Sequence, residues 1–198
     1  MKDFWNQRYQ EEPLAYGKTP NEFFKSVIDE TQPGKLLLPA EGEGRNAIYA
    51  AKKGWEVTAV DFSEEARKKA LAWAAQEEVH ITYHTASLET FEVEENDYDM
   101  VALIYAHMPA HIRQTIHRKF FKALRKGGVL VLEGFNHRQL KNNSGGPKSQ
   151  DMLFELRMLI DDLQGANIHM IEEQTLVLDE GPYHQGQADV IRLFAEKV

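Results

Sequence analysis

Short apolar runs alternate with longer helical patterns along most of this 198-residue chain, and this alternation limits the folds open to it. The first unit joins the run KLLLP at 35–39, a glycine-containing turn at 41–44, a helical pattern over 45–53 and the run EVTAVD at 56–61. Two short strands joined by a helix form a βαβ unit, in which the strands are parallel. The pattern therefore predicts an α/β protein with a parallel sheet.

Later runs extend this sheet and then reverse its direction. A helix over 63–75 leads to strand-like runs at 81–84, 98–105 and 129–135, with a helix over 112–124 and another over 151–163. The runs 168–178 and 189–195 have only a Gly/Pro-rich loop between them, which predicts an antiparallel hairpin at the sheet edge. We expect a mixed, mostly parallel seven-stranded sheet with helices on both faces, a surface loop at 142–148, and a helical lid over residues 1–30.

The length favours a single domain, 1–198, and the composition limits the kinds of molecule that the protein is expected to bind. The net charge of -8 and the pI near 5.5 argue against binding to nucleic acid, which relies on clustered Lys and Arg. The absence of cysteine excludes disulfides and thiolate chemistry. The opening residues lack the apolar core of a signal peptide, and no run approaches the roughly 20 apolar residues of a membrane span. A cytoplasmic protein, monomeric or homodimeric, is expected.

Two glycines and an aspartate follow the first two predicted strands. Gly42 and Gly44 let the backbone approach a ligand closely, and the helix after them offers unpaired N–H groups. Asp61 ends the next run, where a carboxylate can accept both hydroxyls of a ribose. The order of strand, glycine turn, helix, strand and aspartate predicts a nucleotide site. It does not identify the nucleotide, because Gly42-x-Gly44-x-x-Ala47 with Asp61 also fits the fingerprint of dinucleotide-binding proteins. Against NAD(P), the chain has no room for a second domain and ends in a hairpin rather than a second nucleotide-binding half.

Residues 36–61, LLLPAEGEGRNAIYAAKKGWEVTAVD, resemble motifs I and II of class I S-adenosylmethionine-dependent methyltransferases. Residues 121–133, FKALRKGGVLVLE, resemble their strand-5 signature. The chain is most similar to the tellurite-resistance and thiopurine methyltransferase-like branch, through the segments FWNQRY, AYGKTPNEFF, EGEGRN and EGPYHQG. Motif I departs from the family pattern, since Leu38 replaces its opening acid and Ala40 its first glycine.

The resemblance implies a Rossmann-like methyltransferase fold that binds S-adenosylmethionine and releases S-adenosylhomocysteine. Within it, Asp61 would bind the ribose hydroxyls, Phe62 would pack on the adenine, and Glu41 or Glu43 would lie near the methionyl amino group. The cofactor-binding residues that it implies are Tyr16, Gly17, Glu41, Gly42, Glu43, Gly44, Asn46, Asp61, Phe62, Ser63, Ser87, Leu88 and Tyr105.

The acceptor is expected to be a small molecule, with a thiol-like or chalcogen nucleophile, because the chain is too short for a macromolecular recognition domain. A soft anion needs cationic or hydrogen-bonding anchors, whereas a hydroxyl or amine needs a histidine as base. The catalytic candidates are His107, Arg45 and His184, with His111 as a further anchor. An NAD(P)-dependent reductase and a non-catalytic nucleotide-binding module remain alternatives.

No metal site is expected, although His107 and His111 have the spacing of a helical ligand pair. Pro109 between them disfavours a regular helix through both, and no third ligand lies nearby in the sequence.

Overall fold

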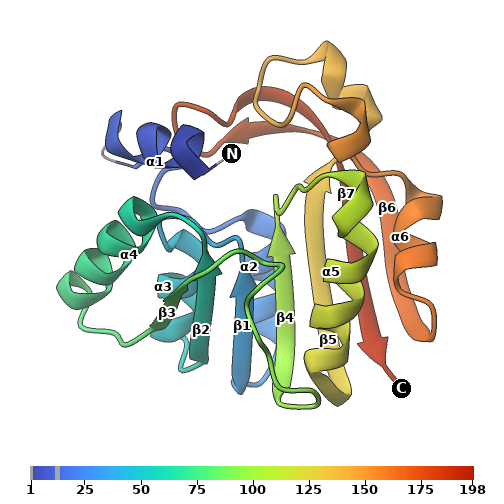
Figure 1. Cartoon of the computed structure of the whole chain (residues 1–198), viewed down its shortest axis with the longest axis horizontal. Helices are drawn as coiled ribbons and strands as arrows, with labels where there is room; N and C mark the ends of the chain where they lie inside the picture. The colour runs from blue at the N-terminus through green and yellow to red at the C-terminus, as the bar shows by residue number, and fades with distance from the viewer. Residues whose placement is uncertain (1, 12–13) are drawn as a thin grey trace.

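A seven-stranded sheet with the order β3-β2-β1-β4-β5-β7-β6 runs through the centre of the computed structural model, which describes residues 2–11 and 14–198 (Figure 1). β1 to β5 are parallel, and β7 runs antiparallel to both of its neighbours, β5 and β6. The predicted mixed, mostly parallel sheet is confirmed. The strands are β1 Lys35–Pro39, β2 Glu56–Asp61, β3 Thr82–Thr85, β4 Tyr98–Ile104, β5 Leu124–Phe135, β6 Ala166–Asp179 and β7 Gln185–Lys197.

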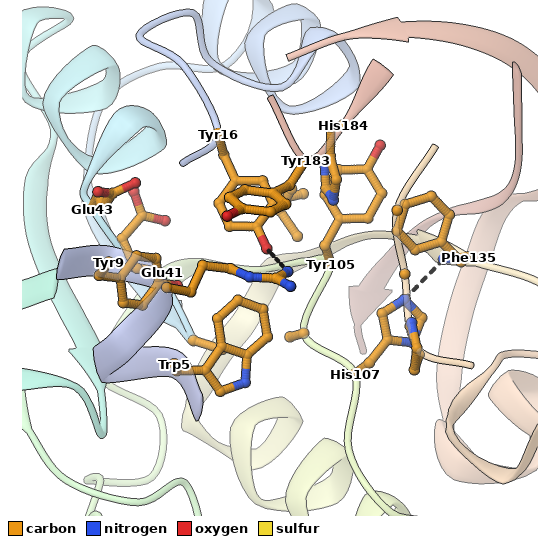
Figure 2. Close-up of a pocket in the computed structure, with 18 of the residues that line it drawn as sticks. Trp5, Tyr9, Tyr16, Glu41, Glu43, Tyr105, His107, Phe135, Tyr183 and His184 are labelled. Atoms are coloured by element: carbon orange, nitrogen blue, oxygen red, sulfur yellow. Dashed lines mark hydrogen bonds between the residues drawn. The ribbon is translucent and has the colours of Figure 1, made fainter. Parts of the chain in front are cut away.

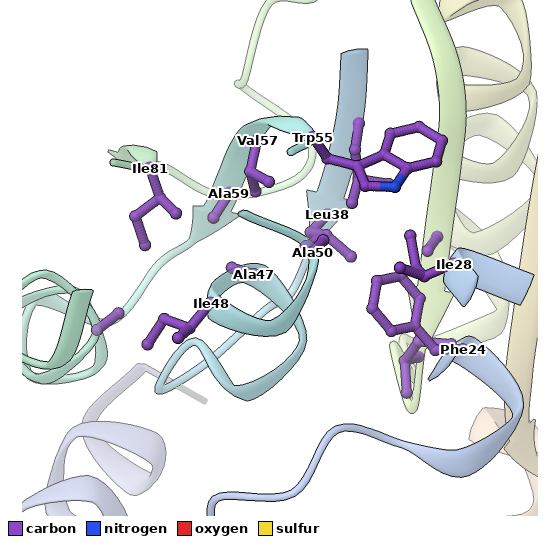
Figure 3. Packing of buried hydrophobic residues seen from close by; sticks show 14 of the residues in the cluster. Phe24, Ile28, Leu38, Ala47, Ile48, Ala50, Trp55, Val57, Ala59 and Ile81 are labelled. Carbon is purple, nitrogen blue, oxygen red and sulfur yellow. The ribbon is translucent and has the colours of Figure 1, made fainter. Parts of the chain in front are cut away.

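Helices cover both faces of the sheet because successive side chains of each buried strand point to opposite sides. In β1, Leu36 and Leu38 belong to one buried cluster, whereas Leu37 belongs to the other. The first cluster includes residues of α2 Glu22–Glu30, α3 Arg45–Lys52 and α4 Glu64–Gln76; the second includes residues of α5 Ala110–Ala123 and α6 Leu156–Asp162. Figure 3 shows α2 and α3 side chains packed on the strands in the first cluster.

The described residues of the predicted lid, 1–30, divide into two parts, and residues 1, 12 and 13 lie outside the described part of the chain. The helix α1 Lys2–Glu11 lies above the carboxyl ends of the strands, beside the β6–β7 connection (Figure 1). The helix α2 instead packs on the sheet, where Phe24 and Ile28 are buried, and Asn21 caps it by accepting the N–H of Phe24. Burial of a side chain of this size stabilises the fold by about 1.5–3 kcal/mol, so the second part of the segment is core rather than lid.

The predicted helix over 151–163 is wrong in its first half. Residues 150–152 form a 3₁₀ helix, η2 Gln150–Met152, and α6 begins only at Leu156. Between them, the N–H of Phe154 donates to the carbonyl of Phe135 at 2.9 Å, and the Phe154 ring is buried in the second cluster. This pairing with the end of β5 outweighs the local helical pattern. A second short helix, η1 His137–Lys141, follows β5.

No helix in the described part of the chain is both long and apolar enough to cross a membrane.

Candidate functional site

A cavity of about 790 Å³ opens at the carboxyl ends of β1, β2, β4 and β5, beneath α1 and the β6–β7 connection (Figure 2). This volume lies within the roughly 300–1,000 Å³ typical of small-molecule sites. Of the residues expected at the site, the following line the cavity: Tyr16, Gly17, Glu41, Gly42, Glu43, Arg45, Asn46, Asp61, Phe62, Tyr105, His107 and His184.

The glycine turn and the aspartate after β2 are in direct contact. The Asp61 carboxylate accepts the N–H of Gly42 at 3.1 Å and the N–H of Ser63 at 2.9 Å. The carboxyl is 5% exposed, and burial raises its pKa to about 6 although the backbone N–H bonds oppose this. Because an ionised carboxylate accepts up to about four hydrogen bonds, Asp61 keeps capacity for ligand hydroxyls. The turn is fixed further by Tyr83, whose hydroxyl donates to the carbonyl of Gly42 at 2.7 Å.

The turn after β1 has a left-handed backbone at Ala40, the position where motif I usually has its first glycine. Ala40 has a φ of 58°, in the left-handed region that glycine enters freely and that costs other residues about 1–2 kcal/mol. Gly44, at a φ of 92°, is the N-cap of α3 and offers no side chain to it. The Glu41 carboxylate accepts the N–H of Ala47 at 2.7 Å instead. Burial raises the pKa of Glu41 to about 7, against the effect of this bond.

Glu43 lines the cavity but is bound by the chain itself. Its carboxylate accepts the N–H of Ala15 at 2.7 Å and the ammonium of Lys69 at 2.8 Å. Burial raises its pKa, and Lys69 opposes the rise. Glu43 therefore fastens the segment after α1 to α4, and Glu41 is the less committed of the two carboxylates expected near a methionyl amino group.

Arg45 forms a buried ion pair rather than an open cationic anchor. Its guanidinium lies 3.0 Å from the Glu180 carboxylate, with both side chains below 10% exposure, and also donates to the carbonyl of Tyr16 at 3.3 Å. Burial favours a higher pKa for Glu180, but the hydrogen bond from His184 and the charge of Arg45 bring it below its usual value. The pair joins the start of α3 to the β6–β7 connection.

His184 stands in the cavity wall beside this ion pair. Its Nδ1 lies 3.1 Å from the Glu180 carboxylate, and its ring packs edge-on against Tyr16 and Tyr105 at centroid distances of 4.6 and 4.5 Å (Figure 2). Burial lowers the pKa of His184, and Glu180 opposes this. Nε2 has no hydrogen-bond partner among the described residues, so a neutral His184 presents an acceptor nitrogen.

Tyr105 is held at the end of β4 by a buried carboxylate that the sequence reading missed. Its backbone has a φ of 52°, and its hydroxyl donates to Glu133 of β5 at 2.8 Å. Glu133 is 1% exposed and also accepts bonds from Asn21 at 2.6 Å and Arg192 at 2.5 Å. A signal existed, since Glu133 is the one charged residue in the apolar run VLVLEGF, and a buried charge needs partners.

His107 is bound at both ring nitrogens. Nδ1 lies 2.7 Å from the carbonyl of Met152, and the N–H of Phe135 donates to Nε2 at 3.0 Å, the bond drawn in Figure 2. Nε2 must therefore carry the lone pair, and burial lowers the pKa of His107 to about 4. With that lone pair engaged, His107 orients the end of β5 and has no free site for a substrate proton.

Four expected cofactor-binding residues do not line the cavity. The Ser63 hydroxyl accepts the N–H of Ala66 at the start of α4, and Gly44 packs against that helix. Ser87 and Thr90 bond to each other in an exposed turn, while Leu88 packs on the second core cluster. His111 is exposed near the start of α5 and lies outside the cavity, and no group of three metal-ligating side chains occurs in residues 2–11 and 14–198.

Aromatic side chains of α1 and of the segment after it lie over the cavity, together with Arg8, which the sequence did not single out. Trp5 of α1 stacks on Tyr9 at 5.6 Å and lies 6.2 Å from Tyr16. Arg8 donates to the Tyr16 hydroxyl at 3.2 Å and covers the Tyr183 ring at 4.1 Å. These contacts hold α1 against the β6–β7 connection.

Comparison with known proteins shows that part of this chain is similar to a methyltransferase domain. Residues 39–128 match the family model described as a methyltransferase domain, a stretch that runs from the end of β1 through Asp61 to the glycines of β5. No curated protein matches the sequence.

Several solved structures share the fold at low sequence identity. TehB from Haemophilus influenzae is 15% identical with a TM-score of 0.77, over 100% of this chain and 67% of that one. Magnesium protoporphyrin IX methyltransferase from Synechocystis PCC 6803, solved with bound S-adenosylmethionine, is 17% identical with a TM-score of 0.70, over 100% and 95%. A protein studied for the conversion of a disulfide bond into a thioacetal group during echinomycin biosynthesis is 18% identical with a TM-score of 0.78, over 100% and 92%.

The match over residues 39–128 agrees with the predicted enzyme class, a methyltransferase that uses S-adenosylmethionine, and the solved structures share the predicted fold. None of the comparisons supports the NAD(P)-dependent reductase.

Proposed function

We propose that this protein transfers the methyl group of S-adenosylmethionine to a small molecule with a thiol-like or chalcogen nucleophile, as in the tellurite-resistance and thiopurine methyltransferase-like branch. The observation that carries the proposal is one cavity with two different ends. Its first end holds Asp61 and Glu41, beside the start of α3; its second holds neutral His184 among aromatic rings.

The first end fits the cofactor. Asp61 is a buried carboxylate with spare acceptor capacity, fixed by Gly42 at the place where a ribose would lie. Glu41 offers a second carboxylate for an ammonium group, and Phe62 lines the same wall. When bound there, S-adenosylmethionine supplies a methyl group already activated by the positive sulfur.

The chain's own residues then align the acceptor and exclude water. Tyr105 at the end of β4 is fixed by Glu133, and α1 with Tyr16 covers the cavity. Good alignment of reactants contributes up to about 7–11 kcal/mol to lowering a barrier, so no covalent enzyme intermediate is required. A deprotonated thiol or chalcogen needs no base. For a protonated thiol, Nε2 of His184 takes the proton, and Glu180 stabilises the imidazolium.

The test is methyl transfer from labelled S-adenosylmethionine to a panel of small thiols, selenite and tellurite, with small amines and alcohols beside them. We expect product from the thiols or chalcogen anions, and a lower kcat for a thiol at neutral pH in His184→Gln. The matched control is His169→Gln, which alters an exposed histidine paired with Glu196 at 2.9 Å. Methylation of amines or alcohols alone would overturn the acceptor class. Cofactor binding without turnover across the panel would favour the non-catalytic module.

A further inference from the structure

Arg8 carries a positive charge into the cavity, and no carboxylate among the side chains that the structure describes neutralises it. Its guanidinium is packed among three rings, with centroid distances of 4.6 Å to Phe4, 5.5 Å to Trp5 and 4.1 Å to Tyr183. Its single hydrogen bond to the described chain goes to the Tyr16 hydroxyl, drawn as a dashed line in Figure 2. A guanidinium has five N–H donors, so most of its donor capacity is unused in this structure.

The other basic side chains of the cavity wall, charged or neutral, are already engaged. Arg45 is paired with Glu180, and Lys148 lies at the exposed rim, where it donates to the carbonyl of Asn142. His107 uses both ring nitrogens, and His184 is bound to Glu180. Among the described residues that line the cavity, Arg8 is therefore the half-buried cation whose charge is open to a ligand.

The charges of the cavity are divided between its ends. Asp61, Glu41 and Glu43 lie at the ends of β1 and β2, whereas Arg8 contacts Tyr183 in the β6–β7 connection, next to His184. Acidic groups suit the ammonium and sulfonium of the cofactor, and they repel an anion. An anionic ligand group is thus favoured on the side of Arg8, where it would meet a fixed fork of donors and the surrounding rings.

We propose that Arg8 is a specificity-determining residue for the methyl acceptor, and that the acceptor bears an anionic group, such as a carboxylate, attached to a planar or aromatic body. This inference rests on the proposed function and deepens it. The guanidinium pairs with the anionic group, and the rings of Trp5 and Tyr183 flank the body. Lysine retains the charge but loses the planar fork, so Arg8→Lys should keep only part of the preference.

The test is calorimetric binding of phenylacetate and of its neutral analogue phenylacetamide to the full-length protein saturated with S-adenosylhomocysteine. In the wild type, phenylacetate should bind at least tenfold more tightly than phenylacetamide. Arg8→Met should abolish this ratio, and Arg8→Lys should retain part of it. The affinity for S-adenosylhomocysteine should change less than twofold in both variants.

A matched control removes an arginine of the same size elsewhere. Arg157 lies on α6 with its side chain 82% exposed, and Arg157→Met should leave the phenylacetate preference intact. The proposal is overturned if the wild type shows no preference, if the preference survives in Arg8→Met, or if Arg8→Met weakens S-adenosylhomocysteine instead, which would assign Arg8 to the cofactor carboxylate. Failure of the wild type to bind S-adenosylhomocysteine refutes the proposed function itself, so the two failures are distinguishable.

Discussion

Removal of one partner from the buried pair of Arg45 and Glu180 should destabilise the fold strongly, and the loss measures how firmly the β6–β7 connection is attached to the start of α3. In the wild type, the side chains of Arg45 and Glu180 are both less than 10% exposed. In Arg45→Met, the buried Glu180 carboxylate loses its cationic partner. Breaking one partner of a buried ion pair typically costs about 3–5 kcal/mol. A domain has a total stability of only about 5–15 kcal/mol, so the effect should be large.

A double-mutant cycle separates the pair from other effects of the substitution. Arg45→Met and Glu180→Gln should each be strongly destabilising, whereas the double variant should cost clearly less than their sum, because no unpaired charge remains. We expect a coupling of at least about 2 kcal/mol, within the range for contacting residues. Urea unfolding followed by circular dichroism gives each free energy of unfolding.

The control cycle uses the exposed pair of Arg157 and Asp161, 3.2 Å apart with exposed fractions of 82% and 44%. Exposed pairs contribute about 0–1 kcal/mol, so this cycle should show little coupling. If Arg45→Met costs no more than Arg157→Met, or if the buried cycle is additive, Arg45 does not have the structural role inferred here.

Two further variants test the burial of His107 and the close packing at Gly44. Burial lowers the pKa of His107 from 6.5 to about 4, so between these values the unfolded chain binds the proton and the folded protein does not. The contribution of His107 to the free energy of unfolding is therefore complete above pH 6.5 and falls by about 3 kcal/mol as the pH is lowered to about 4. Urea unfolding at pH 7 and at pH 4 should show a smaller loss of stability in His107→Gln than in the wild type. An equal loss in the two proteins would contradict the assignment. Gly44→Ala combines a φ of 92° with a new Cβ 2.9 Å from that of Ala70, whereas Gly165→Ala at a φ of 90° meets no atom within 4 Å. Thermal melts should therefore show Gly44→Ala to be less stable than Gly165→Ala by about 1–3 kcal/mol, and equal melting temperatures would refute the crowding.

The fold was predictable where local pattern and tertiary packing agree. The run EVTAVD reads as a buried strand ending in an acid, and β2 has those bounds because Val57 and Ala59 pack under the helices of one face. The local sequence pattern gave the wrong secondary structure where a residue distant in the sequence determines the backbone conformation. Phe154 is extended because it pairs with Phe135, nineteen positions away along the chain but adjacent in space, and no local feature announces this.

The site was predictable in its backbone and less so in its side-chain chemistry. Motif order placed Gly42 next to Asp61, since the carboxyl ends of parallel strands meet at one edge. The partners of Arg45 and His184 depended on Glu180, which approaches only after the terminal hairpin folds back beside β5. The residue types suggested catalytic groups that are free to bind a substrate. In the folded protein, Arg45 is instead paired with Glu180, and both ring nitrogens of His107 are hydrogen-bonded.

The central claim is that the turn at Gly42 and the carboxylate of Asp61 together bind an adenosine. Calorimetric titration with S-adenosylhomocysteine and with NADH tests it most directly, in the wild type and in Asp61→Asn. We predict one S-adenosylhomocysteine bound per chain, at least a tenfold loss of affinity in Asp61→Asn, and no binding of NADH. Tight NADH binding, or S-adenosylhomocysteine affinity indifferent to Asp61, would contradict the account.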